Sequence, residues 1–520
     1  MTGARGAALS VLALLAALMP VAAQEGSALP PSQPASASGS LGDLFKGIGG
    51  AISKIGGRDD KQPMLQQIKA EPYKPSNQAI GEERDVESMR VAGLGLVALR
   101  DYQAYATGLY RKLQQLSGVT GLPGSVHVLA KSDLEASSTP DGNVFLSLGW
   151  IRSLETEDEL AALLAHEAAH VLLRHHDSTM WASIQKQFKS LAGLGAGLKN
   201  QLDKQSQNPQ PLTAGQNKSL QRMELLIDVT EGAVLPAWSR GQENEADRLG
   251  FDLLVKAGYS PVGMTQLLER IANWEEQQAK LKQVQQQEMQ AQVDALVAGG
   301  KAGDAAKQGL MSAVGDFKAQ LAKGHDGADK RAGDLAEYTD KLHANAALPP
   351  LRKAEYQRVI NGAGVKPVLD AYTRVFDGVV QLRQNRYAEA EKTLAETLRP
   401  GAPAQSHVQP NYHMHLALAS LGRSADAQRF LQRSFNAPEP AWKPFETAMR
   451  ELAKRGDRKG ALGVAEVAKR QFKNAPALLP ELVGIYTELR FTDEAKQALA
   501  ACELQHPTYR DACKDRSRSR

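Results

Sequence analysis

The stretch LLAHEAAHVLLRHH, residues 163–176, places four histidines and one glutamate in an otherwise apolar segment. Its centre, residues 166–170, reads His-Glu-Ala-Ala-His and matches the pattern H-E-x-x-H. Side chains four residues apart lie on one face of a helix, so His166 and His170 can reach a single zinc ion. Glu167 lies where a carboxylate can act as general base on a metal-bound water. The stretch therefore predicts a zinc site with an open coordination position.

The residues before and after the motif support a helix. Thr156-Glu157-Asp158-Glu159 reads as a capping box, with Thr156 as the N-cap, and predicts that the helix begins there. At the other end, His175 and His176 follow the motif on a different face of the helix. We expect these two to be solvent-exposed histidines of a helix end, where a positive charge is favourable.

A third ligand is expected from a second helix. The stretch SRGQENEADRLG (239–250) carries Glu243 and Asp247 four residues apart on one face, and the helix is predicted to end before Gly258. Glu243 can complete a His-His-Glu zinc set, and Asp247 can accept a hydrogen bond from a ligand imidazole. Glu245 points to another side and is the weaker candidate. The alternative reading is a solvated acidic face.

These motifs resemble the gluzincin metallopeptidases that include the CAAX-prenyl endoprotease and the HtpX heat-shock protease. The resemblance covers about residues 85 to 340 and includes TEDELAALLAHEAAHVLLRH, SRGQENEADRLGFDLL, KAGYSP and GHDGADKRAGDLAEY. It implies one zinc ion per chain. The zinc ligands implied are His166, His170 and Glu243, with Glu167 as catalytic base and Asp247 as the acid that supports a ligand.

The last block aligns a His-Pro…Arg element of the family with His325 and Arg331, although His325 is followed here by Asp326. The resemblance implies that His325 stabilises the oxyanion or occupies the open zinc position in a resting state. His343 is the competing candidate for this role. The Gln-rich helical insertion predicted around residues 270–322 departs from the usual family pattern.

The first residues have the features of a secretory signal. Arg5 precedes the apolar run ALSVLALLAALMPVAA, which ends in small residues and predicts cleavage after Ala23. An uncleaved anchor is the alternative, although the apolar run is short for a membrane span. Residues 24–79 are expected to be a flexible leader, rich in Pro, Ser, Ala and Gly, which can touch a membrane surface peripherally.

The last third repeats a pattern in which an alanine precedes a helical tail. Ala390, Ala427, Ala461 and Ala495 are separated by 37, 34 and 34 residues, close to the 34-residue period of tetratricopeptide repeats. We expect residues 369–507 to form an α-solenoid whose concave face binds peptide or a partner. A generic alanine-rich helical bundle is the alternative.

The C-terminus and the overall charge limit the possible partners. Cys502 and Cys513 can form a disulfide in an exported protein, and residues 508–520 read as a basic, frayed tail. The net charge is only +4, and no basic patch interleaved with aromatic residues is present, so nucleic-acid binding is not expected.

The predicted fold is mainly α (α+β): a zincin-like helical metalloprotease domain over residues 80–350 with a small β-sheet, followed by the α-solenoid. Residues 126–130 (VHVLA) and 143–148 (NVFLSL) read as strands separated by the turn TPDG. The second of these is expected to be an exposed edge strand that holds an extended substrate by main-chain pairing.

The signal peptide and the repeats together resemble the periplasmic BepA-type branch of the family. The resemblance implies a periplasmic zinc endopeptidase that hydrolyses misfolded or misassembled envelope proteins. The repeats would dock protein substrates or the envelope assembly machinery. The alternative is a chaperone or assembly scaffold for outer-membrane proteins, whose protease activity is latent or secondary.

Overall fold

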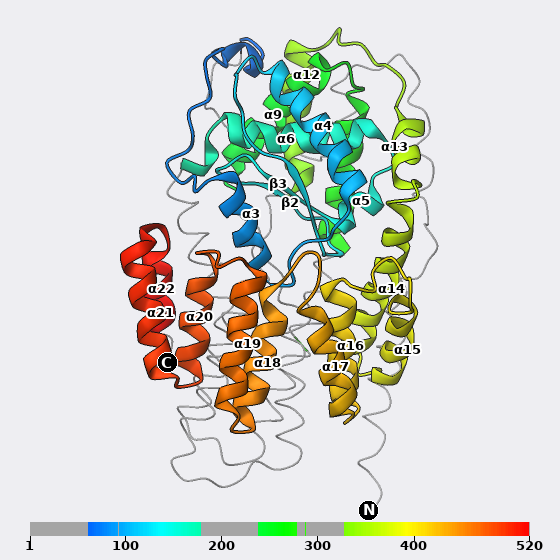
Figure 1. Ribbon diagram of the computed structural model, residues 1–520. Coiled ribbons are helices and arrows are strands. Elements are labelled where there is room, and N and C mark those ends of the chain that lie inside the picture. The colour runs from blue at the N-terminus through cyan, green and yellow to red at the C-terminus, as the bar shows by residue number, and fades with distance from the viewer. Residues whose placement is uncertain (1–60, 92, 178–237, 278–286, 288–326, 519–520) are drawn as a thin grey trace, which may run out of the picture.

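The computed structural model describes residues 61–91, 93–177, 238–277, 287 and 327–518 (Figure 1). The predicted signal peptide, the leader up to residue 60, most of the Gln-rich insertion and His325 lie outside the described residues. The described chain is mainly helical with one small sheet, as predicted. None of its helices is both long and apolar enough to cross a membrane.

Helices α6 (Glu157–Leu172) and α9 (Arg240–Lys256) pack against each other at the centre of the N-terminal half, residues 61–360 (Figure 1). The predicted capping box at Thr156 is confirmed: its hydroxyl accepts from the backbone N–H of Glu159, whose carboxylate accepts from the N–H of Thr156. A second capping box, formed by Ser239 and Gln242, begins α9. Both helices therefore begin at side chains that satisfy free backbone N–H groups.

The sheet has three strands in the order β1-β3-β2, with β1 (Val126–Leu129) parallel to β3 (Val144–Ser147) and β2 (Ala136–Ser138) antiparallel to it. The central strand is β3, so the expectation that residues 143–148 form an edge strand is wrong. The strand β2 lies in a stretch of short polar residues that gives no strand signal, and it packs against α6. The edge nearest α6 therefore belongs to β2.

Other helices cover the sheet and the α6–α9 pair. α4 packs on β1 and α6, and α12 packs on α9. The bounds of these and the remaining helices of the N-terminal half are α3 (Glu82–Val91), α4 (Arg100–Leu116), α5 (Leu148–Ser153), α12 (Ala328–Leu342) and α13 (Lys353–Ile360). The main core of this half brings Tyr102, Tyr110 and Phe251 together with the apolar residues of α6.

The end of the predicted leader is packed against this half. Met64 is buried in the 3-10 turn η1 (Met64–Gln67), which contacts α9. The backbone N–H of Leu65 donates to Asp252 Oδ2 at 2.9 Å, and that of Met64 donates to the Tyr338 hydroxyl at 2.8 Å. Residues 61–79, although predicted as part of the flexible leader, therefore contribute to the folded structure.

The repeat region, residues 366–518, consists of helices that pack in sequential pairs (Figure 1). Ala390, Ala427 and Ala461, three of the four repeat alanines, are fully buried, while Ala495 is partly buried. The helices are α14 (Lys366–Arg383), α15 (Tyr387–Thr397), α16 (Val408–Ser420), α17 (Ser424–Ser434), α18 (Trp442–Lys454), α19 (Arg458–Gln471), α20 (Leu478–Glu488), α21 (Thr492–Gln505) and α22 (Arg510–Arg518).

The C-terminal segment is more ordered than its composition predicts. Cys502 in α21 and Cys513 in α22 form a disulfide, and α22 packs against α20. The expected frayed tail is therefore helical as far as Arg518.

The repeat region contacts the N-terminal half beside α3 and β1. Arg90 Nε lies 2.7 Å from Glu439 Oε2, and the side-chain amide of Gln409 donates to the backbone carbonyl of Ala130. The hydroxyls of Ser88 and Tyr509 are 3.2 Å apart. These contacts fix the position of the repeats relative to the sheet.

Candidate metal centre

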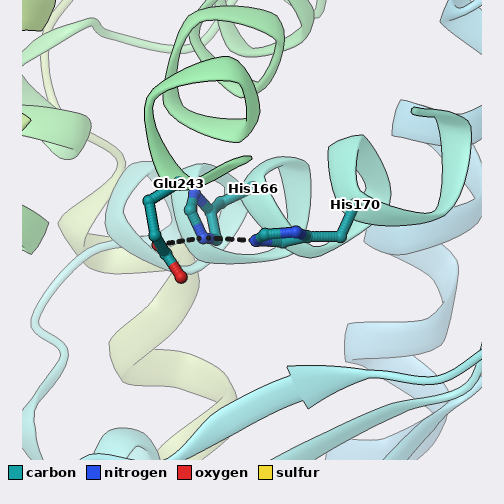
Figure 2. A group of neighbouring side chains, drawn as sticks. All are labelled: His166, His170 and Glu243. Atoms are coloured by element: carbon teal, nitrogen blue, oxygen red, sulfur yellow. Dashed lines mark hydrogen bonds and ion pairs between the residues drawn. The ribbon is translucent and has the colours of Figure 1, made fainter. Parts of the chain in front are cut away.

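His166, His170 and Glu243 converge in the structure, as the motifs predict (Figure 2). The two Nε2 atoms are 3.1 Å apart, and Glu243 Oε2 lies 3.4 Å from His166 Nε2. Ligand atoms on a tetrahedral zinc are separated by roughly 3.3 Å, given zinc–ligand distances near 2.0–2.1 Å. The three side chains are buried, and the donor set of two imidazoles and one carboxylate fits zinc. We refer to these three residues as the candidate metal centre.

Asp247 and Arg331 support this centre from α9 and α12. Asp247 Oδ1 lies 2.9 Å from His166 Nδ1, so the carboxylate favours the tautomer in which Nδ1 carries the proton and the Nε2 lone pair is free. The Arg331 guanidinium donates to both oxygens of Asp247, at 2.8 and 2.6 Å, and lies 3.1 Å from Glu243 Oε2. One buried cation therefore holds the carboxylates of Glu243 and Asp247 in place.

The charges of this group determine how its imidazoles titrate. Burial opposes the charged form of His166, but Asp247 and Glu243 outweigh it and raise the pKa to about 10. Burial, followed by the charge on His166, lowers the pKa of His170 well below its ordinary value. Burial raises the pKa of Asp247, but Arg331 outweighs it and keeps the pKa low. The carboxylates of Glu243 and Asp247 thus favour a cation at this centre, and a metal ion binds only when it displaces the proton from His166 Nε2.

Glu167 lies next to the sheet edge. Its Oε2 accepts a hydrogen bond from the backbone N–H of Ser138, in β2, at 2.7 Å. Burial raises the pKa of this carboxyl above its ordinary value. A raised pKa brings a carboxyl closer to the pH at which it can both accept and return a proton.

The expectation that His175 and His176 are solvent-exposed is wrong, because both are buried. On a continuing helix, a residue five positions after His170 would face roughly 140° away from it. Instead, α6 ends at Leu172, and Arg174 adopts a left-handed backbone conformation with φ +57°. The turn brings His175 back over His170, with 2.8 Å between their Nδ1 atoms.

Glu245 and Trp238 complete this side of the centre, and the sequence analysis did not predict either contact. Glu245 Oε2 lies 3.2 Å from His175 Nε2, although the helical position of Glu245 suggested a lesser role. The Trp238 ring stacks on the His170 ring with 4.7 Å between centroids. Neither contact has a local signal: the first depends on the turn at Arg174, and the second joins residues 68 positions apart in the sequence.

Of the two candidates for the oxyanion role, His325 and His343, the structure describes only His343. His325 lies outside the described residues, while its family partner Arg331 is in place beside Asp247. His343 Nε2 lies 2.7 Å from Asp252 Oδ1, in the cluster that holds η1. His343 therefore takes part in anchoring residues 64–67, away from the candidate metal centre.

The part of the chain that carries the candidate metal centre is similar to known metallopeptidases. Residues 104–339 match the model of peptidase family M48. The metalloprotease YcaL of Escherichia coli is 30% identical over 157 residues, which cover 30% of this chain and 54% of YcaL. The beta-barrel assembly-enhancing protease of Yersinia pestis is 25% identical over 169 residues, 32% of each chain. The metalloprotease LoiP of Escherichia coli is 27% identical over 160 residues, 31% of this chain and 56% of LoiP.

The matches thus span between about a third and just over half of these relatives. The matched segment contains α6, α9 and most of α12, the helices that carry the candidate metal centre and its supporting residues. Over residues 104–339, the chain is therefore similar to the M48 family of metallopeptidases.

Proposed function

We propose that this protein is a zinc-dependent endopeptidase in which His166, His170 and Glu243 hold the metal. The observation that carries the proposal is the convergence of these three ligand atoms, all within 4.8 Å of one another, beside the buried carboxylate of Glu167. When bound, zinc acidifies a water molecule and polarises the scissile carbonyl.

The protein's own residues then supply proton transfer and orientation. Glu167 takes the proton of the attacking water and later delivers it to the leaving amine. The Ser138 N–H, at 2.7 Å, holds one carboxylate oxygen and so orients the other. Asp247 fixes the His166 tautomer, with 2.9 Å between its Oδ1 and His166 Nδ1. The proposed oxyanion role of His325 follows from the family resemblance.

An extended, unfolded chain is the proposed substrate. A substrate strand can pair with an exposed sheet edge by main-chain hydrogen bonds, which a folded protein cannot offer. The strand that brings an edge next to Glu167 is β2, so the substrate-holding role predicted for residues 143–148 passes to this edge. The N–H and carbonyl of Ser138 already bond Glu167 and His176, so a substrate strand would pair beside Ala136.

We further propose that the chain is exported to the periplasm, with cleavage after Ala23, and that it acts on misfolded or misassembled envelope proteins. Four matched relatives bear names that refer to beta-barrel assembly. The domain bounds we propose are 80–350 for the peptidase domain and 369–507 for tetratricopeptide-like repeats. The repeats would dock substrate or the envelope assembly machinery.

A chaperone or assembly scaffold with latent protease activity is the second candidate. It is favoured by the repeat region, whose helices share a hydrophobic core that also includes Val91 of α3, and which is fixed to the N-terminal half by Arg90–Glu439. If cells that carry Glu167→Gln assemble their envelope normally while cells that lack residues 369–507 do not, the scaffold is the main function.

The enzyme is tested with Glu167→Gln on an unfolded protein substrate. The amide cannot act as a base, so we expect cleavage to fall by about 10²–10⁴-fold while zinc stays bound. The matched control is Glu355→Gln, which changes an exposed carboxylate on α13 and should leave the rate unchanged. Cleavage at the wild-type rate by Glu167→Gln would overturn the proposed mechanism.

A further inference from the structure

The chain reverses direction immediately after α6, and this reversal is fixed by several contacts. The backbone N–H of Leu173 donates to the carbonyl of Ala169, and Arg174 Nε donates to Asp177 Oδ2 at 2.6 Å. Asp177 Oδ1 also accepts from the Ser76 hydroxyl at 2.5 Å. A left-handed conformation is unfavourable for arginine, so it persists only where the surroundings determine it. The unfavourable backbone conformation of Arg174 places His175 next to His170.

The hydrogen-bond roles of the imidazoles can be assigned from their partners. If His170 binds a metal through Nε2, its Nδ1 carries a proton and must donate it. The acceptor is His175 Nδ1, at 2.8 Å. His175 then carries its own proton on Nε2, which points to Glu245 Oε2 at 3.2 Å. Each ring nitrogen of the pair thus has one role, and the series ends at a carboxylate.

The surroundings strengthen these contacts. His170 and His175 are 0% and 5% exposed, and Trp238 stacks on the His170 ring. In such a dry environment, a hydrogen bond is stronger than in water, and an unpaired N–H is costly. His175 therefore restrains both the rotation of the His170 ring and the nitrogen on which its proton lies.

We propose that His175 and Glu245 are positioning residues for His170, in the way that Asp247 and Arg331 are for His166. The proposal rests on the proposed function for the metal itself. It assigns a role to two residues that the H-E-x-x-H pattern does not include. The ligand imidazoles are thus supported differently: His166 by a carboxylate directly, and His170 by a neutral imidazole that a carboxylate orients.

The test is zinc affinity, measured on the full chain by competition with a chelator of known affinity. His175→Leu removes the acceptor of the His170 Nδ1–H, and we expect zinc affinity to fall by about 10–100-fold. His175→Asn is the conservative variant, because its Oδ1 occupies nearly the position of Nδ1 and can accept the same hydrogen bond. We expect Asn to recover most of the lost affinity, which a merely structural role would not predict.

Glu245 gives a second, independent test. Glu245→Ala leaves the His175 imidazole without the carboxylate that orients it, so we expect a smaller fall of about 3–10-fold, below the range typical of residues that contact a ligand directly. Glu245→Gln keeps an acceptor and should lie between Ala and wild type. Because Glu245 is partly exposed, these variants should fold even if His175→Leu does not.

The visible absorption spectrum of the Co²⁺-substituted protein provides a readout that does not depend on activity. We expect His175→Leu to shift the ligand-field bands, because the His170 ring is no longer fixed. The control is His407→Leu, which removes a buried imidazole bonded to the Tyr372 hydroxyl in the repeat region. It should lower thermal stability and leave both the spectrum and the zinc affinity unchanged.

The outcomes separate this inference from the function on which it rests. If wild-type protein binds no zinc, the proposed function fails. If wild type binds one zinc and His175→Leu matches its affinity within twofold with an unchanged Co²⁺ spectrum, only the inference fails. If His175→Leu does not fold, wild-type affinity in Glu245→Ala overturns it, and an affinity loss in Glu245→Ala that Glu245→Gln partly recovers supports it.

Discussion

Helices α6 and α9 cross at Gly250, and helices α14 and α15 cross at Gly378. A Cβ at Gly250 would lie 3.0 Å from the backbone nitrogen of His166, whereas a Cβ at Gly378 would lie 2.8 Å from the Leu394 side chain. The first crossing buries imidazoles and carboxylates, and the second buries alanine and leucine. The two regions therefore use the same close approach of helices for different purposes.

The two crossings differ in the free energy that burial of their side chains requires. Charged side chains lose free energy on burial unless each is paired, and apolar replacements are often at least as stable. The α6–α9 crossing keeps its charges, and Arg331 holds both Glu243 and Asp247. The charged and polar side chains buried between α6 and α9 therefore indicate a functional site. The apolar side chains buried between the helices of the repeat region contribute to stability alone.

The largest effect is expected from removal of the carboxylate ligand. Glu243→Ala takes away the anionic member of the zinc set, so we expect zinc content to fall from one per chain to background, measured by metal analysis after dialysis. The matched variant in the repeat region is Glu481→Ala, which breaks an ion pair with Arg516 and should leave zinc unchanged. Equal zinc loss in both variants would mean that the assignment of Glu243 is wrong.

Removal of the disulfide should affect the other region alone. The Cys502–Cys513 bridge closes a short loop with 11 residues of sequence separation. Loop-closure entropy for such a bridge is about 3 kcal/mol. We expect the double variant Cys502→Ser, Cys513→Ser to lose about this much stability in denaturant unfolding, with unchanged zinc affinity. A change in zinc affinity would show that the two regions are coupled.

The sequence alone predicts which side chains converge between α6 and α9 and which alanines are buried in the repeat region. The H-E-x-x-H and Glu–Asp spacings predicted which side chains of α6 and α9 converge, because residues four apart share a helix face. The buried alanines Ala390, Ala427 and Ala461 agree with the repeat pattern. Both predictions rely on helix periodicity, which is local information.

The features that the sequence did not predict depend on distant contacts. The left-handed Arg174, which places His175, is held in part by Asp177 and Ser76. The strand β2 forms from short polar residues because β3 offers it a partner. Residues 64–67 pack because Asp252 and Tyr338 accept hydrogen bonds from their backbone. No local pattern encodes these partners.

The two glycines allow a direct comparison of the crossings. Gly250→Ala would push against the backbone of α6, which moves only as a whole, so we expect a loss of about 2 kcal/mol of stability and weaker zinc binding. Gly378→Ala would press on the fully buried Leu394 side chain, so we expect a loss of stability that the gain in helix propensity, about 1 kcal/mol, offsets only in part, with unchanged zinc affinity. Thermal unfolding and chelator competition measure both. Unchanged zinc affinity in Gly250→Ala would show that the crossing distance does not determine the site.

The smallest expected effect is the pH dependence of stability that comes from two carboxylates, Asp85 in the N-terminal half and Glu446 in the repeat region. Burial raises the pKa of Asp85 to about 6, although Thr139 and Asn143 donate to it. Burial also raises the pKa of Glu446, but Arg450 and Lys443 outweigh it and keep the pKa low. Between pH 3.8 and about 6, folded Asp85 binds more protons than the unfolded chain, so its contribution to stability falls as pH rises.

Asp85→Asn should therefore be more stable than wild type at pH 7, by a part of the roughly 3 kcal/mol that this shift represents, because the buried amide N–H of Asn loses its water. The variant should lose this advantage below pH 4. Glu446→Gln should be less stable at pH 7, because the low folded pKa of Glu446 contributes stability that disappears as pH falls through that pKa. Urea unfolding across this pH range measures both. An Asp85→Asn variant less stable than wild type at pH 7 would contradict the expected sign.

Anomalous diffraction at the zinc edge from crystals of the full chain tests whether α6 and α9 together form a zinc site. We predict one peak, about 2.0–2.2 Å from Nε2 of His166, Nε2 of His170 and a Glu243 oxygen. A zinc peak elsewhere, or one at this position that lacks Glu243 as a ligand, would show that α6 and α9 do not form this zinc site.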